Sequence, residues 1–138
     1  MLIGVITMAV KVVNNTLQVK NLLKKNIVKA LTAVGLYAEG EVKRLVPVDT
    51  GDLRSSITSE VYPDKVRIGS DKNYAVYVEM GTGLFAVEGN GRKTAWVYKA
   101  RNGEVYYTTG QKPQPYLRPG IEQNINQIVA IFENGVKL

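Results

Sequence analysis

The strongest constraint on the fold is a long stretch without proline, residues 17–46. Apolar side chains recur there at every third or fourth position: Leu23, Ile27, Leu31, Val34, Ala38, Val42 and Leu45. That period predicts one long α-helix with one buried stripe. Asn15 or Thr16 can cap its start. Pro47 ends it because a proline disfavours the helical conformation in the residue before it.

Two glycines lie in the second half of this predicted helix. Gly35 and Gly40 each weaken a helix by about 1 kcal/mol relative to alanine. We therefore expect them to mark positions where another element packs closely.

After Pro47 the sequence predicts short strands. Residues 57–61 alternate between apolar and polar side chains, Pro63-Asp64 supplies a turn, and residues 66–68 alternate again. This pattern indicates a β-hairpin. A further strand is expected at residues 74–79, between turn-forming residues on either side.

A second hairpin is expected around Asn102-Gly103, with strands at residues 95–100 and 104–109, because this dipeptide favours a tight turn. The proline-rich residues 111–119 predict an extended connector, and Pro119 suits the first position of a closing helix. Its buried stripe is expected at Ile121, Ile125, Ile128 or Val129, and Phe132, with Gly135 as the C-terminal cap.

These elements predict one α+β domain over residues 1–138, an antiparallel sheet of hairpins with the long N-terminal helix and the C-terminal helix packed on it. Residues 1–13 are expected to contain an N-terminal strand, because apolar and small or polar residues alternate from Ile6 to Val12. Met8 is an alternative start to Met1. This apolar beginning is too short to span a membrane.

The composition excludes several classes of catalytic and metal-binding site. Of 138 residues, 45% are hydrophobic and 22% are charged, as in ordinary globular proteins. Cysteine and histidine are absent. Thiolate nucleophiles, imidazole catalysis and the usual zinc sites are therefore excluded. No compact acidic cluster indicates another metal, so we expect no cofactor. Synthesis in the cytoplasm is consistent with the lack of cysteine.

The formal net charge is +6, and much of it lies in the first helix. Lys20, Lys24, Lys25 and Lys29 fit the solvated face of an amphipathic helix, which we favour over a dedicated nucleic-acid site. A stand-alone nucleic-acid-binding protein is the alternative, supported by this charge and by the aromatic residues of the second hairpin.

The tripeptide Asp49-Thr50-Gly51 matches the catalytic tripeptide of aspartic proteases, and a short chain could act as a retroviral-type homodimer. Here, however, it follows a helix, and Asp52 stands where a small residue is usual. We favour a structural interpretation, in which Asp49 or Thr50 caps a short helical turn, and we expect the chain not to be an enzyme.

Three spaced segments of the sequence together resemble the signature of a known protein family. They are residues 47–57 (PVDTGDLRSSI), 74–82 (YAVYVEMGT) and 114–119 (QPYLRP). In order and spacing they resemble the signature of phage tail-completion proteins, also called head-tail joining or neck proteins. Tyr116 stands where phenylalanine is common in that family, and Gly120 where alanine is common. Residues 84–112 resemble the loop and inserted hairpin of its longer members.

The resemblance implies a ring, hexameric in this family, at the neck or tail of a long-tailed phage or prophage particle. It implies contacts with other neck and tail proteins, passing contact with genomic DNA, and no membrane. The residues that it implies for structure and assembly are Pro47, Asp49, Thr50, Gly51, Leu53, Arg54, Ile57, Tyr74, Tyr77, Glu79, Gly81, Thr82, Pro115, Leu117, Arg118 and Pro119.

Overall fold

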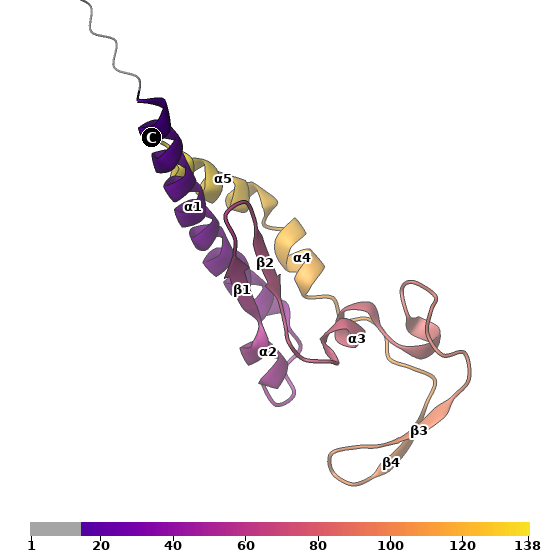
Figure 1. Cartoon of the computed structure of the whole chain (residues 1–138). Helices are drawn as coiled ribbons and strands as arrows, with labels where there is room; N and C mark the ends of the chain where they lie inside the picture. Colours follow the sequence, from indigo (N-terminus) through magenta and orange to yellow (C-terminus); the bar gives the residue numbers. More distant parts are fainter. Residues whose placement is uncertain (1–14) are drawn as a thin grey trace, which may run out of the picture.

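The computed structural model describes residues 15–138, so the strand expected within residues 1–13 and the choice between Met1 and Met8 lie outside the described residues. The elements follow one another as α1 (Thr16–Leu45), α2 (Asp52–Ser56), β1 (Thr58–Val61), β2 (Val66–Gly69), α3 (Ala75–Met80), η1 (Gly83–Phe85), β3 (Trp96–Lys99), β4 (Val105–Thr108), α4 (Leu117–Glu122) and α5 (Ile125–Val136). Helices and hairpins together confirm the predicted α+β class (Figure 1).

Helix α1 forms the long axis of the molecule (Figure 1). Its predicted stripe is buried at Leu31, Val34, Ala38 and Val42. Leu45, the last residue of the helix, is 40% exposed, so its expected burial is wrong. Leu23, near the start of the helix, is 39% exposed. The reason is the length of α5, because the backbone oxygen of Lys137 just after that helix already accepts a hydrogen bond from Asn26 at 3.1 Å. The first turns of α1 therefore extend beyond the helix that covers its middle.

The closing helices pack on α1 and not on a sheet, which corrects one detail of the predicted architecture. Small residues allow this close approach. A Cβ atom at Gly120 would lie 2.8 Å from Val42 Cγ2, and one at Gly135 would lie 2.5 Å from Ala30 Cβ. Gly135 is thus a helix-packing residue inside α5 and not its cap.

Helix α4 also begins two residues before Pro119, at Leu117. A proline is tolerated at this third position because the first amides of a helix have no partner within it.

The β1–β2 hairpin packs on α1 at Gly35, as the glycine pattern predicted. A Cβ atom at Gly35 would lie 3.0 Å from both Ser59 Oγ and Val66 Cγ2, so a side chain there would push the hairpin away from the helix. At Gly40, by contrast, none of the described residues comes within 4 Å of such a Cβ atom, and its expected role in packing is wrong.

A carboxylate on α1 also holds this hairpin. Glu39 Oε2 accepts hydrogen bonds from the Ser59 amide at 3.0 Å and from Ser59 Oγ at 3.1 Å. Glu39 Oε1 lies 2.6 Å from Lys43 Nζ, one helical turn further along α1. The hydrogen bond from Lys43 lowers the pKa of Glu39, and those from Ser59 add to it against the opposing effect of burial.

We expect the unfolding free energy of Glu39→Gln to fall less than that of the wild type as the pH is lowered. The pKa of Glu39 is lower in the folded than in the unfolded chain, so its contribution is complete above the unfolded value near 4.5 and disappears as the pH falls through the folded value. At neutral pH the variant should lose about 1 kcal/mol of unfolding free energy. Urea unfolding of both chains between pH 3 and pH 7 measures this, and parallel curves would contradict it.

The strand expected at residues 74–79 is wrong, because residues 75–80 form the helix α3 and Tyr74 caps it. Their valines and tyrosines favour strands by propensity, but tertiary contacts override that preference. The helix turns Ala75, which is 8% exposed, and Val78 toward the core. Val76 and Tyr77 then face outward.

Both hairpins form where they were predicted, but they do not share a sheet. β1 pairs only with β2, and β3 pairs only with β4, among the described strands. Gly103, with φ of 87°, supplies the positive φ angle of the second turn. The β3–β4 hairpin lies away from α1 and α5 (Figure 1).

The core lies where α1 ends and meets α2, α3 and the connector before α4. Its buried members are Val42, Val46, Leu53, Ile57, Ala75 and Tyr116. Val42 and Ile57 have no exposed surface. Within residues 15–138, no helix combines the length and apolar character that crossing a bilayer requires.

Candidate assembly site

The first of the three signature segments turns the chain sharply after α1. Gly51 has φ of 86°, which only glycine adopts easily, and it directly precedes α2. Thr50 Oγ1 accepts a long hydrogen bond, 3.4 Å, from the Asp52 amide. Asp49 is exposed, and its carboxylate accepts no hydrogen bond from the described residues, so the structure does not show the expected cap by Asp49.

Two side chains of this segment anchor α2, and a third joins it to α1. Leu53 and Ile57 lie in the core. Arg54 Nε donates a hydrogen bond of 3.0 Å to the backbone oxygen of Lys43. The last carbonyl oxygens of a helix have no partner within it, so Arg54 satisfies one of them at the end of α1. Pro47, between the two helices, is half-buried.

The second segment holds the third through one carboxylate. Glu79 Oε2 accepts hydrogen bonds from the amides of Tyr116 at 2.7 Å and Leu117 at 2.9 Å. Glu79 Oε1 accepts another from the amide of Arg118 at 2.9 Å. These amides open α4, where a negative charge is favourable. Glu79 therefore fixes the start of α4 against α3.

The third segment also reaches back into α3. Tyr116 is 3% exposed, and its hydroxyl group donates to the backbone oxygen of Ala75 at 2.9 Å. The Gln114 amide donates to the backbone oxygen of Val78 at 2.8 Å. Burial raises the pKa of Tyr116, and the charge of Glu79 raises it further.

We expect Tyr116→Phe to remove a loss of stability at alkaline pH. The unfolded chain releases the phenolic proton near pH 10, whereas the folded chain retains it because the pKa of Tyr116 is raised. The unfolded state therefore binds fewer protons, and stability falls as the pH rises through this range. The variant should lose about 1 kcal/mol at neutral pH, from the missing hydrogen bond to Ala75. Thermal unfolding at pH 7 and above pH 10 compares the two chains, and an equal alkaline loss in both would contradict the assignment.

The end of the second segment pairs with the chain before the third. The Thr82 amide donates to the backbone oxygen of Gln111 at 2.9 Å, and the Gln111 amide donates to Thr82 Oγ1 at 2.8 Å. Gly81 has φ of 77°, and a Cβ atom there would lie 2.9 Å from the backbone oxygen of Gln111. Glycine is needed at this position for both its conformation and the space.

Several signature residues remain at the surface. Tyr74 is 45% exposed, Tyr77 is 58% exposed, and Pro115 is exposed. Arg118 and Glu122 form an exposed ion pair at 3.0 Å. The segments thus form a packed interior, and part of their surface is open to contacts with other molecules.

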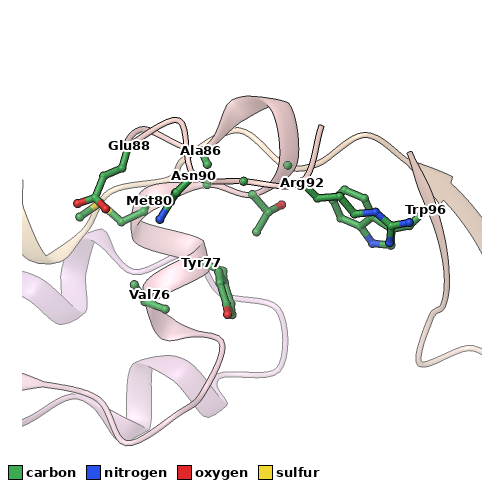
Figure 2. Close-up of a pocket in the computed structure, with 12 residues that line it drawn as sticks. Val76, Tyr77, Met80, Ala86, Glu88, Asn90, Arg92 and Trp96 are labelled. Carbon is green, nitrogen blue, oxygen red and sulfur yellow. The ribbon is translucent and has the colours of Figure 1, made fainter. Parts of the chain in front are cut away.

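A groove lies beside this surface, between α3 and the glycine-rich loop that follows it (Figure 2). Its volume is about 470 Å³. Met80 and Glu88 lie at one end, and Arg92 lies over the ring of Trp96 at the other, with 5.6 Å between the guanidinium carbon and the ring centroid (Figure 2). Sequence reasoning missed this groove, because α3 was expected to be a strand.

The arrangement offers no catalytic constellation among the described residues. The Asp49-Thr50-Gly51 tripeptide lies in a surface turn between α1 and α2. Nor do any three histidine, cysteine, aspartate or glutamate side chains gather as metal ligands in the part of the chain that the structure describes. The hydrogen bonds of the signature segments instead join one part of the backbone to another.

The fold defines a small α+β protein. Residues 12–81 match the HK97-gp10-like family, described as "Bacteriophage HK97-gp10, putative tail-component", and the chain belongs to this family. The match includes the first signature segment and the second one up to Gly81, and it confirms the resemblance to phage tail proteins. The third segment and the β3–β4 hairpin lie outside the matched residues. No curated protein and no solved structure matches the chain.

Membership gives the coarse function. The chain is a component of the phage tail, and it therefore belongs to the virion and interacts with other tail proteins.

Proposed function

We propose that this tail component completes the tail at its junction with the head, and that it does so as a ring. The joined signature segments support the proposal because they pack α2, α3 and the start of α4 around one core. The family resemblance of the sequence adds the expected number of subunits, six.

The observation that carries the proposal is the amount of apolar surface left uncovered. The described residues expose more large hydrophobic side chains than they bury. In the β3–β4 hairpin, Val97 is 59% exposed, Val105 is 65% exposed and Tyr107 is 77% exposed. A contiguous apolar surface of this kind is typical of a subunit that associates with partners.

Deletion of the gene from the phage or prophage tests the role. We expect filled heads and free tails that fail to join, seen by negative-stain electron microscopy, and restored infectious particles when the wild-type chain is supplied. Asp49→Asn is a useful complementing variant, because it removes the protease tripeptide and should still restore particles. Joined, infectious particles without the protein would contradict the proposal.

The ring itself is tested on the purified chain and on particles. Native mass spectrometry of the concentrated protein, and of necks released from particles, should show a species six times the mass of the chain. Ring contacts depend on concentration and on the tail as a template, so the released necks are the decisive sample. A single copy in each neck would exclude a ring.

Passing contact with DNA is part of the same proposal. Lys20, Lys24, Lys25 and Lys29 are all exposed along the first half of α1, as predicted for a solvated face. If they line the channel, a Lys→Gln variant at all four positions should change the rate of DNA ejection while rings still form, because the attraction between lysines and phosphates is lost. A gel shift that persists at near-physiological salt would instead favour the stand-alone nucleic-acid-binding alternative.

A further inference from the structure

The β3–β4 hairpin has two faces of different character. Residues that pair across the strands share a face, and the pairs are Trp96 with Thr108, Val97 with Tyr107, Tyr98 with Tyr106 and Lys99 with Val105. The inner face carries Trp96 and the stacked rings of Tyr98 and Tyr106, whose centroids are 5.8 Å apart. The outer face consists of Val97, Lys99, Val105 and Tyr107.

Within one copy, no other part of residues 15–138 covers the outer face. Val97, Val105 and Tyr107 are each more than half exposed, and the two strands pack mainly on each other. A two-stranded hairpin alone is marginally stable in water and needs a further layer against an apolar face. The outer face is therefore suited to a partner.

The groove beside α3 is a second apolar surface that could receive the outer face. It lies on the side of the hairpin opposite to the outer face. Val76, Tyr77 and Met80 provide apolar lining, and Trp96 closes the groove from the inner face of the hairpin (Figure 2). Trp96 and Val97 are neighbours in one strand, so their side chains point to opposite faces. The outer face of a copy thus points away from that copy's own groove.

Charge supports the match between the two surfaces. Glu88 lies in the groove, is exposed, and has no ionic or hydrogen-bond partner among the described residues. Lys99 is the one charged residue of the outer face, and within residues 15–138 it too has no such partner. The groove has a second charged residue, Arg92, but it lies at the other end of the groove, over the ring of Trp96. The Glu88 end of the groove and the outer face therefore carry opposite charges beside apolar side chains.

We propose that the outer face of the hairpin docks into the α3 groove of a second copy, with Lys99 beside Glu88 of that copy. Because groove and outer face point in opposite directions, each copy binds one neighbour with its hairpin and another with its groove. Such a head-to-tail contact closes into a ring when the rotation between copies allows it. The inference rests on the proposed ring and names its interface.

Charge exchange tests the contact. Lys99→Glu and Glu88→Lys each place like charges together, and each should weaken self-association of the full chain about tenfold in sedimentation velocity. An equimolar mixture of the two variants should associate again, since each hairpin then meets a groove of opposite charge. Lys72→Glu is the matched control, with the same charge change in the exposed turn before α3, and it should associate like the wild type.

The apolar part of the contact is tested at Tyr107. Tyr107→Ser should weaken association about thirtyfold, because a central aromatic residue contributes strongly to an interface. Circular dichroism and thermal unfolding of the monomer should be unchanged, since Tyr107 is 77% exposed.

The outcomes separate this interface from the ring itself. A wild-type chain that remains monomeric at every concentration, and is present once in each neck, overturns both proposals. A wild-type chain that assembles, with Lys99→Glu, Glu88→Lys and Tyr107→Ser assembling equally well, overturns this interface and leaves the ring. Association of the mixture without association of either single variant supports the contact between Lys99 and Glu88.

Discussion

Replacement of Ile57 by alanine should lower the free energy of unfolding by about 3 to 4 kcal/mol. Ile57 has no exposed surface, and it packs in the core with Val42, Leu53 and Tyr116. The variant loses the transfer energy of three carbon atoms and leaves a cavity that fixed neighbours cannot fill. Urea unfolding at neutral pH, followed by circular dichroism, measures the change.

Val48→Ala is the control for this prediction. Val48 lies in the same signature segment but is 55% exposed, so its truncation should cost less than about 0.5 kcal/mol. Equal losses at the two positions would show that the core does not lie where α1, α2 and α3 meet.

The second large effect is expected at Glu79. Glu79→Ala should lower the free energy of unfolding by about 3 kcal/mol, because three backbone amides lose a charged acceptor and one of them belongs to the buried Tyr116. We also expect faster hydrogen exchange at the amides of Leu117 and Arg118, since the start of α4 is no longer held. Denaturant unfolding and exchange measured by NMR test the two effects together.

Glu122→Ala provides the comparison. Glu122 is the last residue of α4, the helix whose start Glu79 holds. Its exposed ion pair with Arg118 should contribute little to stability in water. Stability and exchange should therefore remain close to wild type. If Glu79→Ala behaved like Glu122→Ala, the joint between the second and third signature segments would not depend on this carboxylate.

Much of α1 was predictable because its signal is periodic and long. The recurrence of apolar residues indicated the helix, its end at Pro47 and the burial of Leu31 to Val42. The glycine pattern indicated close packing at Gly35 but failed at Gly40. A glycine changes helix propensity wherever it stands, whereas the neighbour that makes it necessary, here Ser59, is known only from the folded chain.

The short segments were less predictable. Residues 74–79 are rich in strand-forming side chains, and six residues are too few to separate a strand period from a helical one. The groove was missed for the same reason, because only a helical turn directs Val76, Tyr77 and Met80 into one wall with the later loop. Asp49 was expected as a cap from residue type alone, although geometry decides whether a side chain reaches an amide.

The signature segments show which properties follow from the sequence and which depend on the tertiary structure. By itself the sequence determined the α+β class, the long helix, both hairpin turns and a resemblance through three short segments, since all of these depend on neighbours along the chain. Only the tertiary structure decided that Glu79 and Tyr116 join these segments, that α5 packs on α1, and that no other described residues cover the outer face of the hairpin. These properties depend on contacts between residues far apart in the chain. The local sequence pattern does not indicate which distant residue will be the partner.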